Sequence, residues 1–205
     1  MANNVGEQIG ASAKDALGAV SALAVNPVGG LSSAYSALGP ARALGAGAAL
    51  CVIFALLGAL GAAIGSERMM MTFGIGLADV MESNWFSIFL KTFFSMLVLP
   101  AAMVATSLGA RKVLSGSGPL AADLFTVGAA LTPLGIAILL TSFLGLGNYE
   151  LSMLLLVFAS CYLVLMLFAG LTRLGGLTEK AAAPAVPIVF VISLYICKVV
   201  LTSMM

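Results

Sequence analysis

The chain has 205 residues, of which 61% are hydrophobic and 8% are charged, and its formal net charge is +1. A soluble domain averages about 45–50% apolar and about 25% charged residues, and a water-soluble fold of this size cannot hide so much apolar surface. The composition therefore places the chain in a lipid bilayer and gives no indication of nucleic-acid binding. Histidine, the commonest metal ligand and general base, is absent. We expect no metal or cofactor, and we interpret the three separated cysteines, Cys51, Cys161 and Cys197, as small buried hydrophobes.

Residues 1–40 are predicted to form a cytoplasmic N-terminal segment. Between residues 1 and 25, apolar side chains recur at helical spacing, and most charged or amide side chains lie off that face. The apolar positions are Val5, Ile9, Ala13, Ala16, Val20 and Leu23, widened by Leu17 and Ala24. The sequence NPVGG at 26–30 is expected to end this helix, and a short amphipathic stretch with Leu31, Ala34, Tyr35 and Leu38 follows before Gly39 and Pro40. These helices are expected at the membrane interface, either as a structural lid over the bundle or as a docking site for a cytoplasmic partner.

Residues 41–205 are predicted to form a transmembrane domain of five helices. A membrane-spanning helix needs about 20 predominantly apolar residues. The charge-poor runs place the spans at about 43–66, 85–109, 122–145, 150–172 and 182–203. The third and fourth runs are separated only by LGLGNYE, which predicts a tight helical hairpin. The fold class is therefore all-α, a polytopic membrane protein with five transmembrane helices and an N-terminal amphipathic, interfacial helix.

The first span is rich in small residues. Gly61 and Gly65 form a GxxxG pair, and Gly58 and Ala62 form a second pair of small residues at the same spacing. Small residues let membrane helices approach closely. The pattern predicts helix packing at these four positions, either within the chain or between two copies of it.

Lysine and arginine residues alternate between loops in a way that predicts orientation. With five spans, Lys14, Arg42, Arg111, Lys112, Arg173 and Lys180 all fall on one side. The other side carries Arg68 alone, beside Glu67, Asp79, Glu82 and Glu150. By the positive-inside rule, the N-terminus is expected to be cytoplasmic and the C-terminus outside.

Two further lysines, Lys91 and Lys198, lie inside apolar runs near the outer boundary. A lysine so close to a helix end usually extends to the headgroups, and the alternative is a pore-lining residue or an ion pair, such as Lys91 with Glu82 or Asp79. Trp85, Phe86 and Tyr149 are expected in an aromatic belt at the same boundary.

Pro133 lies near the middle of the third run, beside Thr132, in the sequence GAALTPLG. A proline inside a membrane helix frees a carbonyl group and kinks the helix, at a cost that packing or a nearby hydroxyl can offset. The residue is therefore interpreted either as a fixed kink that shapes the bundle or as a hinge or break that lines a polar cavity.

The overall pattern resembles the Yip-domain family of integral membrane proteins, named for binding Ypt/Rab GTPases. The resemblance covers about residues 26–205 and rests on five closely spaced spans after a cytoplasmic N-terminus, on NPVGGLSSAYSALGP before the first span, and on LTP in the third. It also rests on CYLVLMLFAGLTRLGGLTEKAA, where Tyr162, Gly170-Leu171 and Lys180 mark the expected short cytoplasmic turn. The chain lacks the long acidic or Pro-rich N-terminal region of eukaryotic members and looks like bacterial ones, which implies a bacterial inner membrane. The resemblance implies roles in membrane organisation and trafficking, and no catalytic residues.

These observations favour a non-enzymatic membrane scaffold or partner-binding protein. Its partners would be the lipid bilayer, a cytoplasmic or membrane protein, and a second copy of the chain. The alternative is a small transporter or channel subunit that uses the third helix around Thr132 and Pro133, with Lys91 and Lys198 as further candidate residues. An enzyme would need clustered catalytic side chains at membrane depth. The close carboxylate pair Asp79 and Glu82 is interpreted instead as part of a solvated acidic loop.

Overall fold

The computed structural model describes residues 2–73, 85–144 and 148–204, and all its regular elements there are helices. They are α1 (Ala2–Val25), α2 (Pro27–Phe73), α3 (Trp85–Val113), α4 (Leu120–Leu144), α5 (Tyr149–Ala169) and α6 (Glu179–Met204), with a π-helical turn, η3 (Gly170–Leu174), continuing α5. Five helical segments in these ranges are long and apolar enough to cross a membrane. The predicted helical, multi-pass architecture is therefore confirmed.

The first two helices meet at Asn26, where the sequence predicted a boundary. The Asn26 side chain accepts a hydrogen bond from the backbone N–H of Gly29 at 2.8 Å, and Pro27 stands at the first position of α2. Asn is a favoured N-cap, and proline fits the first helical position because its missing N–H would have no partner there. The NPVGG sequence thus ends one helix and at once starts the next.

A kink at Gly39 divides α2 into two segments. Gly39 has a φ of 72° and a ψ of 163°, a conformation that essentially only glycine adopts, and Pro40 follows it. Before the kink, Leu31 is fully buried, while Ala34, Tyr35 and Leu38 pack against the core. The stretch before Gly39 and Pro40 is therefore helical, and these apolar side chains face the bundle.

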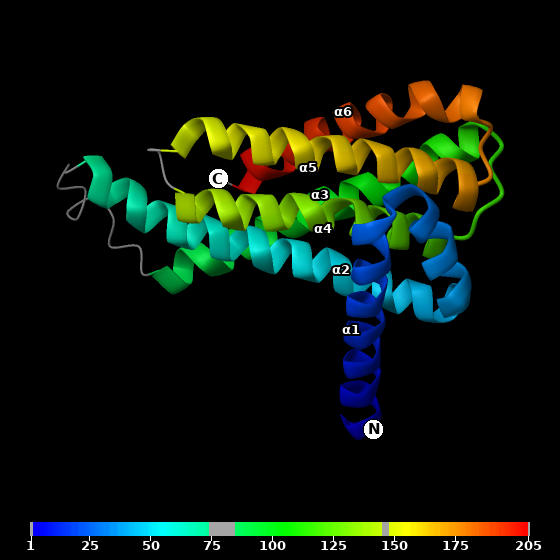
Figure 1. Ribbon diagram of the computed structural model, residues 1–205, viewed down its shortest axis with the longest axis horizontal. Coiled ribbons are helices and arrows are strands. Elements are labelled where there is room, and N and C mark those ends of the chain that lie inside the picture. The colour runs from blue at the N-terminus through cyan, green and yellow to red at the C-terminus, as the bar shows by residue number, and fades with distance from the viewer. Residues whose placement is uncertain (1, 74–84, 145–147, 205) are drawn as a thin grey trace.

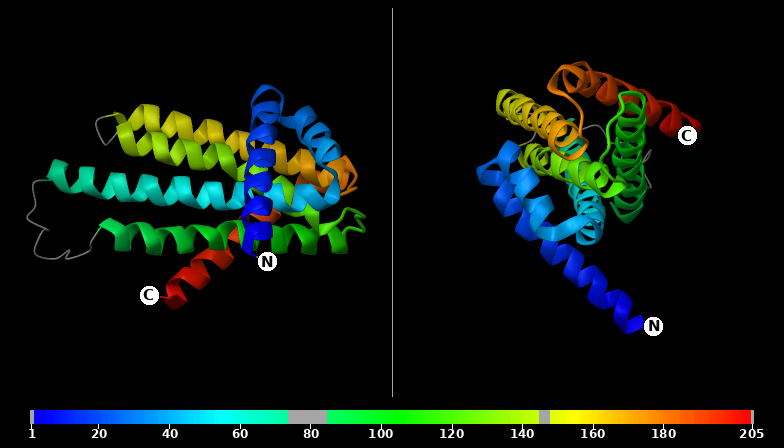
Figure 2. Two further views of the ribbon diagram at one scale, coloured as in Figure 1. Left: turned by 90° about the horizontal axis from the view of Figure 1, so that it is seen from below. Right: turned by 90° about the vertical axis from the view of Figure 1, so that its right-hand side faces the viewer.

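The bundle is built around α4, which contacts α2, α3 and α5 (Figure 1). Helix α6 packs mainly on α3 and partly on α5. Helix α1 runs across the bundle in all the views, whereas α4, α5 and the part of α2 after Gly39 run along it and α6 runs obliquely (Figure 2). The large side chains of the core come from several helices and include Phe54, Met103, Phe125, Leu131 and Leu163, all of them fully buried.

Helices α2 and α4 meet backbone to backbone. A Cβ atom on Gly47 would lie 2.6 Å from the backbone nitrogen of Phe125, and one on Gly128 would lie 2.6 Å from the carbonyl oxygen of Gly47. Real Cβ atoms do not approach other atoms so closely. Glycine at these two positions is therefore what lets the two helices touch, in the manner of membrane helix pairs.

The small residues singled out in the first span also lie at helix contacts within the chain. Gly61 and Gly65 face Ser142 of α4, and Gly58 faces Met96 of α3. Ala62, the fourth residue of this set, is half-buried. The structure thus places the three glycines against neighbouring helices of the same molecule.

The expectation that all three cysteines are buried needs correction at Cys161. Cys51 is buried and Cys197 half-buried, but Cys161 is exposed. It lies on a face of α5 with Val157, Val164 and Leu165, which are themselves exposed. An apolar face at membrane depth contacts lipid, so a small hydrophobe is stable there without being covered by protein.

Candidate functional site

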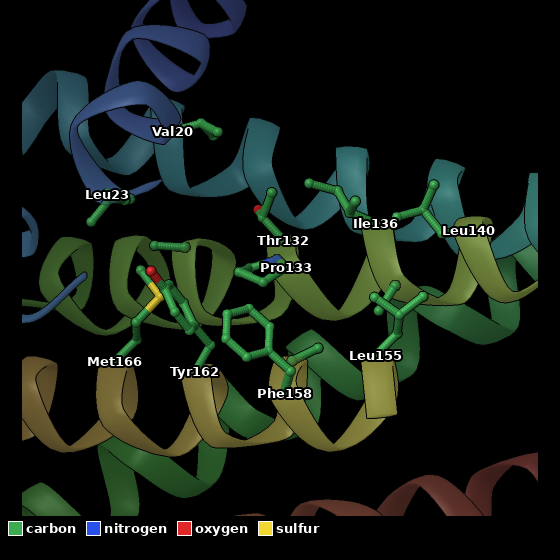
Figure 3. A pocket seen from close by; sticks show the side chains of 13 residues that line it. Val20, Leu23, Thr132, Pro133, Ile136, Leu140, Leu155, Phe158, Tyr162 and Met166 are labelled. Carbon is green, nitrogen blue, oxygen red and sulfur yellow. The ribbon is translucent and has the colours of Figure 1, made fainter. Parts of the chain in front are cut away.

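Pro133 lines a groove between α4, α5 and the end of α1 (Figure 3). The groove has a volume of about 360 Å³. Its wall on α4 runs from Ala129 to Leu140, and its wall on α5 runs from Leu155 to Met166. Val20 and Leu23 of α1 close it at one end. The candidate residues Thr132 and Pro133 therefore lie together in one concave site.

The groove is apolar, and its hydroxyl at Thr132 is satisfied within α4. Thr132 Oγ1 donates to the carbonyl oxygen of Gly128 at 2.8 Å. Pro133 lacks the N–H that would bond to the carbonyl of Ala129, so the hydroxyl serves the neighbouring carbonyl and not the one that the proline frees. The α-helix continues through Pro133 from Leu120 to Leu144. One interpretation of Pro133 was a break that lines a polar cavity. The structure has an unbroken helix and an apolar groove at this position.

Helix α1 is held against the bundle by small side chains and one ion pair. Ala16, Ala19 and Leu23 are buried, as predicted for Ala16 and Leu23, whereas Leu17 is 65% exposed and does not widen the buried face. Asp15 accepts two hydrogen bonds from the guanidinium of Arg42 on α2. Hydrogen bonding to Arg42 lowers the pKa of the Asp15 carboxyl below its ordinary value, so the pair is charged at neutral pH.

The two lysines proposed as functional candidates lie away from this groove. Lys91 of α3 and Lys198 of α6 are both exposed, and neither lines the groove. The carboxylates suggested as partners of Lys91, Asp79 and Glu82, lie outside the described residues. Trp85 stacks on Phe89 with ring centroids 5.8 Å apart, close to Lys91 along α3.

Trp85, Phe86 and Tyr149, which the sequence assigned to an aromatic belt, are exposed. Trp85 and Tyr149 begin α3 and α5, which start at the same end of the bundle (Figure 1). The opposite end carries the loops between α3 and α4 and between α5 and α6, joined by a hydrogen bond from the Ser117 N–H to the carbonyl of Gly175 at 3.1 Å. Because Arg111 and Lys112 lie in the last turn of α3 and Arg173 lies in η3, next to these loops, we call it the basic end.

A buried ion pair at the basic end was missed by the sequence analysis. Arg111, in the last turn of α3, donates from Nε to Asp123 in the first turn of α4 at 3.1 Å and also from Nη2. Its Nη1 donates to the carbonyl of Gly118 in the connecting loop. The two side chains are only 8% and 3% exposed. Each charge also has the sign that favours its helix end.

The short spacing of this pair was the available signal. Asp123 is twelve positions after Arg111, and the loop between them contains Gly116, Gly118 and Pro119. Arg111 was interpreted only as a marker of membrane side, and Asp123 only as the boundary of the third apolar run. A short connection brings the end of one helix next to the start of the next, which makes an ion pair across it geometrically accessible.

Further buried hydroxyls lie between the helices. Thr106 of α3 and Ser193 of α6 are hydrogen-bonded to each other at 2.7 Å. The hydroxyls of Tyr35, Ser107 and Thr126 are buried without a hydrogen-bond partner among the described residues. Within those residues there is no cluster of three or more metal-ligating side chains.

The chain is thus an α-helical, multi-pass membrane protein with an apolar groove beside Pro133 and a buried ion pair at its basic end. Comparisons with protein-family models, with curated proteins and with solved structures find no match.

Proposed function

We propose that this protein is a non-enzymatic membrane scaffold that holds α1 at the bilayer surface and presents the basic end of the bundle to a protein partner. The role is of the kind that the Yip-type resemblance implies, in membrane organisation or trafficking. The observation that carries the proposal is the backbone-to-backbone contact of α2 with α4 at Gly47 and Gly128.

That contact favours a rigid support over a conduit. Glycine contacts of this kind bring two helices to their closest approach, and the surrounding core is filled by fully buried side chains such as Phe54 and Phe125. The interior of the bundle is therefore occupied along the α2–α4 seam, where a passage through the middle of the molecule would otherwise run.

The placement of α1 supports a surface role. The helix crosses the bundle instead of running along it (Figure 2). Its inner face is packed at Ala16 and Ala19, while Lys14 and Leu17 point outward and are exposed. A helix that lies across the spans runs along the membrane plane, which is the geometry of an interfacial helix.

The orientation is part of the proposal. We place the basic end in the cytoplasm, with the N-terminus, and the C-terminus on the other side. Six of the nine lysine and arginine residues belong to the segments assigned to the cytoplasmic side, namely Lys14, Arg42, Arg111, Lys112, Arg173 and Lys180. A bacterial inner membrane is the location that the resemblance favours.

The test is affinity purification of the tagged, full-length protein in a mild detergent, with variants of the pair Asp15–Arg42. The expected result is one stoichiometric partner with the wild type, loss of it with Asp15→Arg, and recovery with Asp15→Arg/Arg42→Asp. The double variant restores an ion pair with the charges exchanged, so it separates the position of α1 from the identity of either side chain. Failure to recover any stoichiometric partner would contradict a scaffold function.

A small transporter is the second candidate, favoured by the membrane-exposed groove at Pro133. It predicts solute flux in proteoliposomes that falls on Pro133→Ala or Lys91→Ala. The scaffold proposal predicts no flux for any solute tested, and a flux sensitive to Pro133→Ala would replace it.

A further inference from the structure

We propose that the groove between α1, α4 and α5 is a binding site for one acyl chain of a membrane lipid, with α1 as its closed end. This inference concerns a ligand and is independent of any protein partner. It rests on the position, the length and the lining of the groove.

The position of the groove determines what can enter it. Its walls on α4 and α5 belong to segments long and apolar enough to span the bilayer. Several residues of its rim face outward, including Ile136 and Leu140 on α4 and Phe158 on α5. The groove thus opens sideways into the hydrocarbon region, where the surrounding solvent is acyl chain and not water.

The length of the groove matches one leaflet. From Ala129 to Leu140 the wall on α4 covers about 16 Å at 1.5 Å per residue. The hydrocarbon core of a bilayer is about 30 Å thick, so this is about half of it. The groove begins beside α1, which runs across the bundle, and follows the direction of the spans away from it (Figure 3). An acyl chain of one leaflet takes that course.

The volume and the lining also fit a hydrocarbon chain. A water molecule takes about 30 Å³ of liquid, and a methylene group is of similar size, so a 360 Å³ cavity takes on the order of a dozen such groups. Among the described residues that line it, all but Thr132 and Tyr162 are apolar, and the Thr132 hydroxyl is already bonded to Gly128. A polar ligand would find few partners there, whereas a chain needs none.

An occupant is needed because the groove cannot easily close. Its end is fixed by α1, whose buried residues Ala16 and Leu23 and whose ion pair with Arg42 hold it across the bundle. An empty groove would leave its walls without van der Waals contacts on one side. An acyl chain in the groove therefore stabilises the packing of α1, α4 and α5 through van der Waals contacts. It gains no hydrophobic free energy, because it leaves an environment of other lipid tails.

The test uses the full chain reconstituted into phospholipid vesicles that contain a phosphatidylcholine with a diazirine midway along one acyl chain. After irradiation, adducts are mapped by peptide mass spectrometry. We expect more adducts on the groove residues than on the outward face of α5, where Leu154 and Val164 are exposed. Ile136→Trp, which fills the groove from α4, should lower groove adducts several-fold and leave the outward face of α5 unchanged.

Two further variants complete the test. Ala159→Leu fills the groove from α5 and should lower the groove adducts as well, so the result does not depend on one variant folding. Leu154→Trp places the same indole on a lipid-facing surface outside the groove and should change nothing there. Each variant is first compared with the wild type by size-exclusion chromatography and thermal unfolding.

Three results would overturn the proposal. Adducts spread evenly over all lipid-facing surfaces would mean that the groove holds no particular chain. Groove adducts that persist in both filling variants would mean that they arise elsewhere. Adducts on the outward face of α5 with none on the groove residues of the wild type would mean that acyl chains do not enter the groove.

Discussion

Removal of either partner of the Arg111–Asp123 pair should be among the most destabilising single substitutions in this chain. Asp123→Leu leaves the guanidinium of Arg111 buried, with its hydrogen bond to the carbonyl of Gly118 and no counter-charge. Breaking a buried ion pair from one side typically costs about 3–5 kcal/mol. Because the pair lies at the basic end, water can reach a relaxed guanidinium, and we expect a cost towards the lower limit, about 3 kcal/mol.

The double variant Arg111→Met/Asp123→Leu separates pairing from packing. Replacement of a buried pair by apolar side chains of similar volume is often neutral, so the double variant should cost well under the sum of the two single variants. The difference should be at least about 2 kcal/mol of coupling, within the range found for residues in direct contact. The Gly118 bond is lost in this variant too, which adds about 1 kcal/mol.

The measurement is a thermodynamic cycle over four proteins, unfolded reversibly by a denaturing detergent in mixed micelles and followed by far-ultraviolet circular dichroism. If the two single variants add within about 0.5 kcal/mol, the pair carries no coupling energy and the reasoning is wrong. Single variants that each cost under 1 kcal/mol would show that the pair is solvated in the membrane-bound protein.

Three further outcomes follow from the packing and from the first ion pair. Gly47→Ala should destabilise the bundle by about 1–3 kcal/mol, because its Cβ would lie 2.6 Å from the α4 backbone. The control, Gly109→Ala, should be neutral or stabilising, because no atom lies within 4 Å of its Cβ. The same unfolding assay compares the two variants. Gly39→Ala should cost about 1–3 kcal/mol in that assay through backbone strain alone, because no atom lies within 4 Å and the φ is +72°; a neutral result would contradict the kink. The folded-state pKa of Asp15 is depressed, so its contact with Arg42 should be complete above the ordinary value of 3.8 and be lost as the pH falls through the lower folded-state pKa. The distance between spin labels on α1 and α2 should increase there, and Asp15→Asn should abolish the pH dependence.

The spans could be predicted because each depends on a local property of the chain. Length and hydropathy identify a bilayer-crossing segment without reference to its neighbours. The expected 85–109 and 122–145 correspond to α3 at Trp85–Val113 and α4 at Leu120–Leu144. Between these two helices, the main difference is at the end of α3, where the charged Arg111 and Lys112 were taken as loop but complete the last helical turn. Basic residues are favourable at a helix C-terminus, so charge alone does not end a helix.

The groove could not be predicted, because it depends on where α1 lies relative to α4 and α5. The apolar periodicity of residues 1–25 predicted a helix, and Ala16 and Leu23 of the predicted face are buried, but no local pattern fixes the direction in which that helix crosses the bundle. Pro133 was selected for its effect on its own helix. Its place in the site comes instead from facing the end of α1 and the α5 wall.

The partner site and the acyl-chain site that we propose both involve α1, and they should therefore depend on each other. Helix α1 closes the groove with Val20 and Leu23, and one turn earlier it is held to α2 through Asp15. A partner that binds α1 in this position adds to the energy that keeps the groove closed at that end, whereas a partner that draws α1 away opens it. By linkage, the factor by which partner binding changes the affinity for the acyl chain must equal the factor by which acyl-chain binding changes the affinity for the partner. Partner affinity measured in vesicles for wild type and Ile136→Trp would therefore give the coupling directly, and equal affinities would show that α1 supports the two sites independently.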